Sequence, residues 1–240
     1  MSLLRVKSVT KKFGGLTANE DVSFSIDIKD KAKIVALIGP NGAGKTTLFN
    51  CVAGYSPATS GEIWLNDINI TSFTPEECAR VGIGRTFQVA RTFTSMTALE
   101  NVMVGAFLHD RNVATARKAA EELLEFVNLG KLKNKVAADI TISEQRRLAV
   151  ARALAVKPKL LLMDEVMAGL TEPEMKIMID VVFKIRDRGI SCLIVEHVLE
   201  QIWPITDQVV VLYLGKKLAD DKPEIVRANE EVRKKYTGDE

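Results

Sequence analysis

A run of nine residues in the first quarter of the chain has the composition of a phosphate-binding loop. It consists of Gly39, Pro40, Asn41, Gly42, Ala43, Gly44, Lys45, Thr46 and Thr47, and it fits the spacing G-x-x-x-x-G-K-[ST]. Glycines permit positive φ, so main-chain N–H groups can turn inward around phosphate oxygens. Lys45 can neutralise the outer phosphates, and the Thr46 hydroxyl is an oxygen ligand of the kind that Mg²⁺ prefers. The pattern predicts a nucleotide site with Mg²⁺ rather than an accidental glycine turn.

Two carboxylates follow an apolar stretch in the second half of the chain. Residues 160–163 are Leu-Leu-Leu-Met and run directly into Asp164 and Glu165. Neighbouring side chains of a strand point to opposite sides, so Asp164 can face the metal while Glu165 faces the γ-phosphate. Another apolar stretch, at 192–195, is closely followed by His197, whose imidazole can bond a phosphate oxygen or the attacking water. An acidic loop and a structural histidine are the alternatives; beside a phosphate loop, the nucleotide interpretation is favoured.

Short β-branched runs alternate with helix-like stretches. Strands are expected at 34–38, 63–65, 160–163, 192–195 and 209–214, and helices at 46–53, 113–129, 144–156 and 174–188. Three of the strand-like runs are almost entirely apolar, which is typical of a buried parallel sheet covered by helices, the α/β pattern. Gly130 and Gly189 are predicted to stop the second and fourth of these helices, and Ser143 is predicted to cap the third.

The ends of the chain are rich in predicted strands, and its middle, at about 89–157, is helical. The last stretch, 222–240, mixes both signs of charge, which predicts a solvated helix and tail, with a tail that docks on a partner as the alternative. No internal repeat interrupts this order. We therefore expect one globular unit with an inserted helical part.

Composition excludes several classes of protein. Of the 240 residues, 47% are hydrophobic and 27% are charged, which excludes a disordered chain, a collagen and a disulfide scaffold. The net charge of +2 is too small to favour wrapping around nucleic acid. Cys51, Cys78 and Cys192 lie far apart, which predicts neither a zinc site nor disulfides and fits a reducing cytoplasm. No run approaches the roughly 20 apolar residues of a membrane span, and we expect no signal peptide, so any membrane role must come from another subunit.

The motifs, in this order and spacing, resemble those of the ATP-binding subunits of ABC transporters over nearly the whole chain. The resemblance implies a single ABC ATPase domain at 1–240. Its expected fold is a P-loop NTPase (RecA-like) α/β core with an antiparallel β subdomain and an α-helical subdomain inserted at about 89–157. ATP and Mg²⁺ are the implied cofactors.

The same resemblance assigns roles to individual residues. The phosphate loop is the Walker A motif, the strand ending at Asp164 is the Walker B motif, and Glu165 and His197 match the catalytic glutamate and the switch histidine. Gln88, in the tetrad Arg85-Thr86-Phe87-Gln88, matches a glutamine that ligates Mg²⁺ and reports the ion to the helical part. Phe13 matches an aromatic residue that stacks on adenine, with a core phenylalanine as the equal alternative.

Within the family, three segments are similar to the ATPase subunit of branched-chain amino-acid importers: residues 13–18, 85–88 and 96–102. Importers of urea, amides or other polar solutes are similar too. The resemblance implies a second ATPase subunit, with which ATP is sandwiched, and permease subunits that hold the chain at the inner face of the membrane. It also implies an indirect partner, the solute-binding protein, and no nucleic acid.

The contact with the permease is expected at 89–101. Phe93, Met96 and Leu99 are the candidate exposed anchors there, and burial in the core is the alternative for each of them. If the importer interpretation holds, the helical part carries the groove that receives the membrane subunit.

One family motif departs from its usual form. The signature, roughly Leu-Ser-Gly-Gly-Gln or -Glu, caps the γ-phosphate of ATP bound to the opposite subunit. Here Thr141 can replace the serine, but Ile142 and Ser143 stand where two glycines are expected. The branched side chain of Ile142 is expected to crowd the site and to weaken closure around the partner's ATP. Thr171 also replaces an aspartate of many relatives. We hypothesise that the chain binds Mg-ATP normally but hydrolyses it slowly alone, or that a partner supplies the better signature.

Three functions are compared. The first is the energising subunit of a transporter, in which ATP closes two such domains and hydrolysis opens them. The second is a DNA-repair or chromosome-structure ATPase, but Thr141 follows Gln88 by only 53 residues, too few for the long coiled coil of those proteins. The third is a regulatory module that binds ATP with little turnover, and the altered signature keeps this alternative open.

Overall fold

The centre of the molecule is a largely parallel sheet. The computed structural model describes residues 2–28, 31–88, 91–196 and 199–237, and within them this sheet has the strand order β10-β9-β3-β8-β7-β6. The strands from β9 to β6 are parallel, and β10 pairs antiparallel with β9 at one edge. The bounds are β3 Ile34–Ile38, β6 Ile83–Arg85, β7 Leu160–Asp164, β8 Ser191–Val195, β9 Gln208–Tyr213 and β10 Lys216–Asp221. The apolar runs predicted β3, β7, β8 and β9 to within one residue, and the α/β prediction is confirmed.

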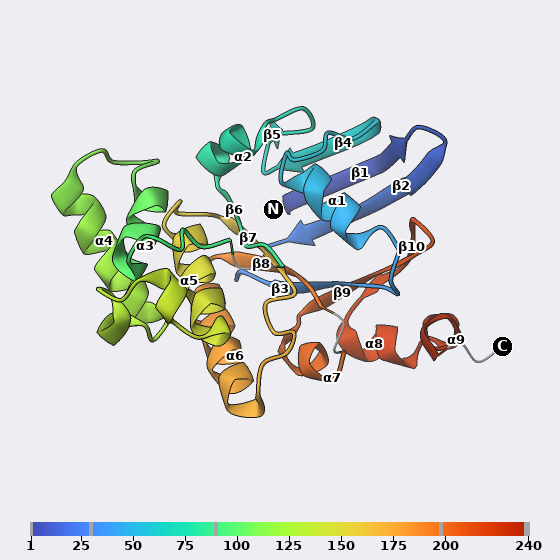
Figure 1. The fold of residues 1–240 in the computed structure, drawn as a ribbon. Coiled ribbons are helices and arrows are strands. Elements are labelled where there is room, and N and C mark those ends of the chain that lie inside the picture. The colour runs from blue at the N-terminus through green and yellow to red at the C-terminus, as the bar shows by residue number, and fades with distance from the viewer. Residues whose placement is uncertain (1, 29–30, 89–90, 197–198, 238–240) are drawn as a thin grey trace.

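A smaller antiparallel sheet lies beside the first (Figure 1). Its strands are β1 Ser2–Phe13, β2 Leu16–Asp27, β4 Ser60–Leu65 and β5 Ile68–Asn69, in the order β2-β1-β4-β5. Gly14, with φ 57°, turns β1 into β2. The run predicted at 63–65 belongs to this sheet. Ile63 and Leu65 are buried and Trp64 between them is only half-buried, because one face of the sheet packs on the core.

Helices cover both sheets. Their bounds are α1 Lys45–Val52, α2 Pro75–Val81, α3 Ala98–Ala106, α4 Val113–Phe126, α5 Ile142–Leu154, α6 Glu172–Asp187, α7 Leu199–Ile202, α8 Pro223–Ala228 and α9 Glu230–Thr237. Short 3₁₀ turns occupy Gly130–Leu132, Ala137–Asp139 and Trp203–Ile205. Helices α3, α4 and α5 gather at one end of the larger sheet, and α8 and α9 lie at the opposite side of the molecule (Figure 1). Among the described residues, no helix has both the length and the apolar character needed to cross a bilayer.

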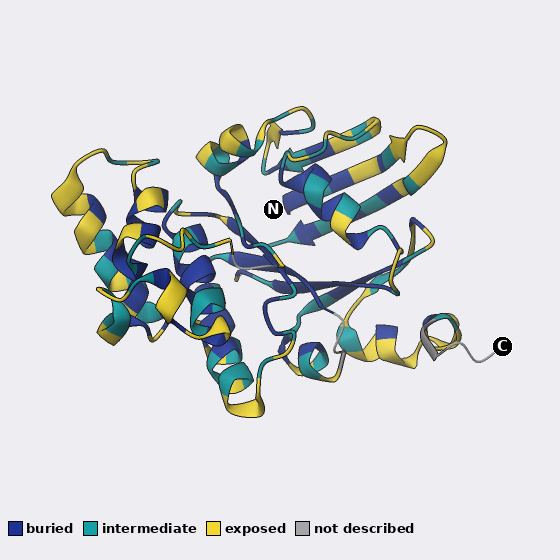
Figure 2. Cartoon of the chain, viewed as in Figure 1, coloured by how far each residue is buried: buried dark blue, intermediate teal, exposed yellow. Residues whose placement is uncertain are grey.

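The two faces of the parallel sheet contribute to two separate hydrophobic clusters. On β3, Val35 and Leu37 face the cluster that includes α1 and the antiparallel sheet, whereas Ile34, Ala36 and Ile38 face the cluster formed with α3, α4, α5 and α6. The inner strands β3, β7 and β8 are therefore buried on both sides (Figure 2). This double burial explains why β3, β7 and β8 are apolar runs without alternation. It also fixes the strand ends from which the candidate site residues extend.

Several helix boundaries differ from the sequence prediction by two or three residues, and two of these differences have a clear local reason. Helix α5 begins at Ile142 and is capped by Thr141, not by Ser143, because the hydroxyl of Thr141 accepts from the Glu144 N–H while the Glu144 carboxylate accepts from the Thr141 N–H. Helix α4 ends at Phe126, before the predicted stop at Gly130. Asn128 takes the left-handed conformation there, with φ 60°, which asparagine tolerates better than most residues. Gly189, with φ 82°, follows the end of α6 as predicted.

The C-terminal stretch is not the fully solvated helix and tail that its charges predicted. Helices α8 and α9 each bury one valine in the larger core cluster, Val226 and Val232, which are 1% and 4% exposed. The charged residues of these helices cover the outer side. Residues 238–240 of the predicted tail lie outside the described part of the chain.

The three cysteines are buried and have free thiols. Burial raises the pKa of Cys51 and of Cys78 to about 11 and that of Cys192 to about 12. A thiol must ionise to attack or to bind a metal tightly, so these three side chains act as small apolar residues of the core.

Candidate nucleotide site

The glycine-rich loop joins the end of β3 to the start of α1, as the motif predicted. Gly42 and Gly44 have φ values of 79° and 96°, a region that side chains with a Cβ rarely adopt. At Gly44 a Cβ would also collide with the side chain of Asn19 and the carbonyl of Ala18. Gly44 is therefore required twice, by its backbone conformation and by the close approach of β2. The loop holds the first N–H groups of α1 open toward the cavity, where a phosphate can accept from them.

Lys45 lies inside the loop that it follows. Its ammonium group donates to the carbonyls of Gly39 at 2.6 Å and Pro40 at 2.9 Å, and the residue is 6% exposed. Burial lowers the pKa of Lys45, and the carboxylates of Glu165 and Asp164 oppose that shift. The ammonium group is thus poorly hydrated and close to both acids. In such an environment its charge-assisted hydrogen bond to a phosphate oxygen is strong.

The predicted acid pair lies at the end of β7. Asp164 is 5% exposed, and its N–H donates to Thr86 Oγ1 at 3.2 Å. Glu165 follows in the left-handed conformation, with φ 48°, and its N–H donates to the carbonyl of Val195 at 2.9 Å. A non-glycine residue held there costs roughly 1 to 3 kcal/mol, and such strain concentrates at functional sites. The Glu165 side chain lines the same cavity as the phosphate loop.

Gln88 meets Glu165 although 77 residues separate them. The Nε2 group of Gln88 donates to Oε2 of Glu165 at 2.7 Å. Both residues line a cavity of about 590 Å³ together with most of the phosphate loop, a volume typical of small-ligand sites. The complete lining is Phe13, Leu16, Thr17, Ala18, Asn41, Gly42, Ala43, Gly44, Lys45, Thr46, Thr47, Gln88, Glu165, Leu214 and Gly215. The sequence predicted ten of these, from four separate parts of the chain.

The side chains around the cavity suit Mg²⁺ held jointly with phosphate. Thr46 and Gln88 offer a hydroxyl and an amide oxygen inside the cavity, and Asp164 offers a carboxylate next to Glu165. All three are oxygen donors, and Mg²⁺ commonly takes only one or two carboxylates and completes its shell with phosphates and water. In the described part of the chain no three His, Cys, Asp or Glu side chains form a group that could hold a metal ion. The donor set therefore fits a nucleotide-bound Mg²⁺ better than a protein-enclosed metal.

The rim of the cavity is apolar and exposed. Phe13 is 51% exposed at the end of β1, and the ammonium group of Lys11 lies 5.0 Å from the centroid of its ring. The core alternative for Phe13 is wrong, and its contact with adenine stays a prediction. Leu16 and Leu214, 67% and 74% exposed, extend the same rim.

Sequence reasoning missed several residues of this cavity. Leu214 and Gly215, in the turn between β9 and β10, line it, and the Gly215 N–H donates to the carbonyl of Ala43 at 3.2 Å. The fully buried amide of Asn19 donates to the Gly44 carbonyl at 3.2 Å and supports the loop from β2. No local motif marks these positions, because they arise from the contact between the two sheets.

The remaining predicted residues do not line the cavity. Thr141 and Ser143 belong to the start of α5, and neither is among the lining residues. The Thr141 hydroxyl caps its own helix, Ser143 is buried with a hydrogen bond to Glu174, and Ile142 is 71% exposed. Ile142 therefore projects outward, and its effect on ATP bound to a partner subunit stays a prediction. His197 lies outside the described residues.

A glycine loop between a buried parallel strand and a helix, with two acids at the end of a nearby strand, defines a P-loop nucleotide hydrolase. Over residues 20–168 the sequence matches the family described as "ABC transporter". The chain belongs to this family, as one of its ATP-binding cassette ATPases.

Similar proteins of this family include transport subunits from several organisms. The branched-chain amino acid transport ATP-binding protein BraF of Pseudomonas aeruginosa is 36% identical, over 99% of this chain and 98% of its own length. LivG of Escherichia coli, also a branched-chain amino acid transport ATP-binding protein, is 34% identical over the same shares. The archaeal LivG of Archaeoglobus fulgidus is 33% identical, over 99% of this chain and 96% of its own length.

Solved cassettes share the fold. The ADP conformation of MJ1267, an ATP-binding cassette of an ABC transporter, superposes with a TM-score of 0.89 at 28% identity and full coverage of both chains. The cassette MJ0796, as a post-hydrolysis dimer bound to ADP and Pi, gives a TM-score of 0.80 at 26% identity, covering 92% of this chain and 98% of its own. The expected P-loop NTPase fold is confirmed.

Proposed function

We propose that the chain is the ATP-hydrolysing subunit of an importer for branched-chain or other hydrophobic amino acids. The observation that carries the proposal is the single cavity where the phosphate loop, Gln88 and Glu165 meet. The names of BraF and LivG, at 33 to 36% identity over nearly whole chains, support the solute class. We propose 1–240 as one ATPase domain, with 89–157 as its helical subdomain.

Each site residue then has a definite task. The loop N–H groups and Lys45 bind the phosphates, and Phe13 stacks on the adenine. Thr46, Gln88 and Asp164 hold a Mg²⁺ ion, which when bound neutralises charge on the phosphates. Glu165 orients the attacking water and accepts its proton, and His197 bonds the γ-phosphate. Gln88 donates to Glu165, so it links the water-activating acid to the segment that leads into the helices.

We propose two kinds of direct partner. A second ATPase subunit contributes Thr141 and Ser143 to the ATP bound here, and the dimer of MJ0796 is a precedent for such an assembly. Permease subunits hold the chain at the cytoplasmic face of the membrane, and through them it acts with a solute-binding protein.

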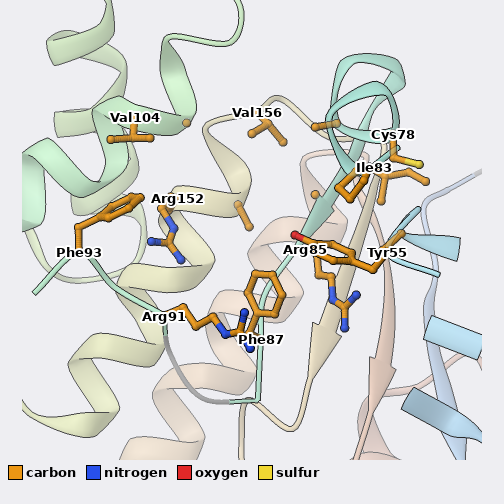
Figure 3. Close-up of a pocket in the computed structure, with 16 residues that line it drawn as sticks. Tyr55, Cys78, Ile83, Arg85, Phe87, Arg91, Phe93, Val104, Arg152 and Val156 are labelled. Carbon is orange, nitrogen blue, oxygen red and sulfur yellow. The ribbon is translucent and has the colours of Figure 1, made fainter. Parts of the chain in front are cut away.

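A second cavity, of about 420 Å³, suits the permease (Figure 3). It lies where α2, α3 and α5 approach β6, and its described lining includes Arg85, Arg91 and Arg152 but no aspartate or glutamate. Phe93 also lines it, is 44% exposed, and stacks with Arg152 at 5.2 Å. Charge complementarity favours a permease segment that brings a carboxylate and apolar side chains. We name this the docking cavity.

Of the anchors predicted from sequence, only Phe93 lines the docking cavity. Leu99 is 3% exposed and packs in the core on α3, so its prediction as an exposed anchor is wrong. Met96 is partly buried. Residues 89 and 90 of the predicted contact lie outside the described part of the chain.

Reconstitution tests the proposed function. The chain is co-expressed with branched-chain permease subunits, inserted with them into liposomes, and supplied with solute-binding protein and internal ATP. We expect the chain to copurify with the permease and to drive uptake of labelled leucine, while Glu165→Gln supports no uptake. Uptake of urea but not leucine would contradict the solute class, and failure to copurify would contradict the permease partnership.

The altered signature gives a separate prediction. Ile142 points outward where the partner's ATP is expected, whereas Ser143 faces α6. Ile142→Gly is therefore expected to raise ATP turnover of the isolated chain by about threefold to tenfold, since close main-chain approach to phosphate is restored. Ile225→Gly, which removes another exposed isoleucine near the start of a helix, α8, is the matched control and should leave turnover unchanged. Equal rates for wild type and Ile142→Gly, measured by phosphate release, would show that the signature does not slow hydrolysis.

A further inference from the structure

Arg85 connects the docking cavity with the acid pair at the end of β7. It is the last residue of β6 and lines the docking cavity (Figure 3). Its side chain is 9% exposed, and its Nη2 lies 3.7 Å from Oδ2 of Asp164, whose side chain is 7% exposed. One buried cation therefore connects the proposed permease surface to the carboxylate assigned to Mg²⁺.

Aromatic rings hold the guanidinium of Arg85. Its central carbon lies 4.8 Å from the ring centroid of Tyr55, 5.0 Å from that of Phe87 and 5.5 Å from that of Phe49. The rings of Tyr55 and Phe87 also contact each other edge to face, with centroids 5.6 Å apart. Both of these rings line the docking cavity, so a segment that fills the cavity must pack against the residues that hold the cation.

The polar contacts of Arg85 are few for a buried cation. Within the described residues, its buried Nε and Nη1 atoms have no hydrogen-bond partner. Ring contacts and one ion pair to Asp164 hold the group, and the 3.7 Å separation exceeds that of a strong charge-assisted hydrogen bond. Such a guanidinium can change its position when the surrounding rings move, because few directional bonds resist the change.

We propose that Arg85 is a positioning residue that competes with Mg²⁺ for Asp164 until a permease segment fills the docking cavity. Occupancy displaces the rings of Tyr55 and Phe87, the guanidinium moves with them, and the carboxylate turns to the metal. The inference rests on the proposed function, since it needs both the nucleotide site and the permease. It adds to that function a reason for the isolated subunit to use Mg-ATP less well than the assembled transporter.

The position of Asp164 does not depend on Arg85 alone. The Asp164 N–H donates to Thr86 Oγ1 at 3.2 Å, and β7 pairs with β8 as far as Asp164 and Val195. Lys45 also stays near the carboxylate when Arg85 is replaced. Removing the guanidinium therefore removes a competing cation while the strand end keeps its place. The expected sign is a gain in Mg²⁺ affinity.

The test compares Arg85→Met with Arg85→Lys in the full chain. A fluorescent ATP analogue reports binding across a Mg²⁺ concentration series that starts from chelated buffer. Arg85→Met is expected to lower the half-saturating Mg²⁺ concentration about tenfold, which corresponds to about 1.4 kcal/mol. Arg85→Lys, which keeps the charge, should stay within about twofold of wild type, a difference of roughly 0.4 kcal/mol. If Arg85 had a purely structural role, Arg85→Met would not raise the affinity for Mg²⁺ while Arg85→Lys leaves it unchanged.

Phe87→Leu is the second variant, because it weakens the aromatic contacts and leaves every charge in place. It is expected to lower the half-saturating Mg²⁺ concentration about threefold, or roughly 0.7 kcal/mol, and keeps the test valid if Arg85→Met does not fold. Binding of the wild-type chain to detergent-solubilised permease should shift the Mg²⁺ dependence in the same direction. Binding of Arg85→Met to permease should add no shift.

Three results would overturn the inference: an unchanged or raised half-saturating Mg²⁺ concentration in Arg85→Met, the same in Phe87→Leu, or no shift when wild type binds permease. Each of these leaves the proposed function intact, because wild type still binds ATP with Mg²⁺. Failure of wild type to bind ATP at any Mg²⁺ concentration would instead contradict the proposed function itself. The two failures are therefore distinguishable in one set of measurements.

Discussion

Glu165→Gln is expected to lower steady-state ATP hydrolysis by about a hundredfold or more, because a general base contributes roughly 10²- to 10⁴-fold. The glutamine amide has the shape of the carboxylate but cannot accept a proton from water. It can still accept the hydrogen bond that Gln88 donates to Glu165 at 2.7 Å. The left-handed backbone conformation at residue 165, with φ 48°, costs about the same free energy with glutamine as with glutamate, so the fold should not change.

Binding and turnover must be measured separately for this variant. Phosphate release gives the rate, and a fluorescent ATP analogue together with size-exclusion chromatography gives nucleotide retention and dimer formation. We expect Glu165→Gln to keep ATP and to favour the closed dimer. Glu172→Gln on α6 is the matched control, since it removes one exposed carboxylate whose ion pair, among the described residues, is with Lys176 in the same helix. Steady-state hydrolysis at the wild-type rate would remove Glu165 from its catalytic role.

The core of the fold could be predicted because its strands are buried on both faces. A strand such as β3 or β7 needs apolar residues at every position, so it appears in the sequence as a continuous run with sharp ends. The long hairpin of β1 and β2 has no such run. Its buried positions alternate irregularly with lysines, threonines and asparagines, and bulges shift its register. Only the family resemblance predicted an antiparallel part.

The helix boundaries that were wrong could have been predicted from local chemistry. Thr141 and Glu144 have the spacing of a capping box, which recurs at Thr74 and Glu77 and at Thr97 and Glu100. Ser143 lacks this partner and lies inside the helix. The apolar spacing of α4 continues beyond Phe126, but the left-handed conformation of Asn128 ends the helix.

The phosphate loop and the acids were predictable because each is a contiguous motif with one required chemistry. The roles of Asn19, Leu214 and Arg85 were not, because each depends on residues that are distant in sequence. Asn19 reaches Gly44 only because the antiparallel sheet packs over the loop. Arg85 meets Asp164 only because β6 pairs with β7. Patterns along the chain carry no signal for such contacts.

Lys45→Ala is expected to weaken ATP binding by about a hundredfold, which corresponds to about 2.7 kcal/mol, near the upper limit for a hydrogen bond to a charged group. The ammonium group is buried in the loop, and burial already lowers its pKa, so water does not compensate its charge well. A triphosphate supplies that compensation. The free protein loses little when the side chain is removed, because a buried cation costs desolvation. We therefore expect an unfolding temperature equal to or above that of wild type.

Calorimetry with ATP and Mg²⁺ measures the loss, and the unfolding temperature shows that the variant is folded. Lys11→Ala is the matched control: it removes the same charge beside the rim residue Phe13, where the ammonium group lies 5.0 Å from the ring centroid. If net charge near the cavity decided affinity, both variants would weaken binding equally. If the Lys45 ammonium group contacts the phosphates directly, only Lys45→Ala is expected to weaken ATP binding. If folded Lys45→Ala binds ATP with the wild-type affinity, the role of the phosphate loop is contradicted. If folded wild-type protein gives no heat with ATP and Mg²⁺, the assignment of the nucleotide site as a whole is contradicted.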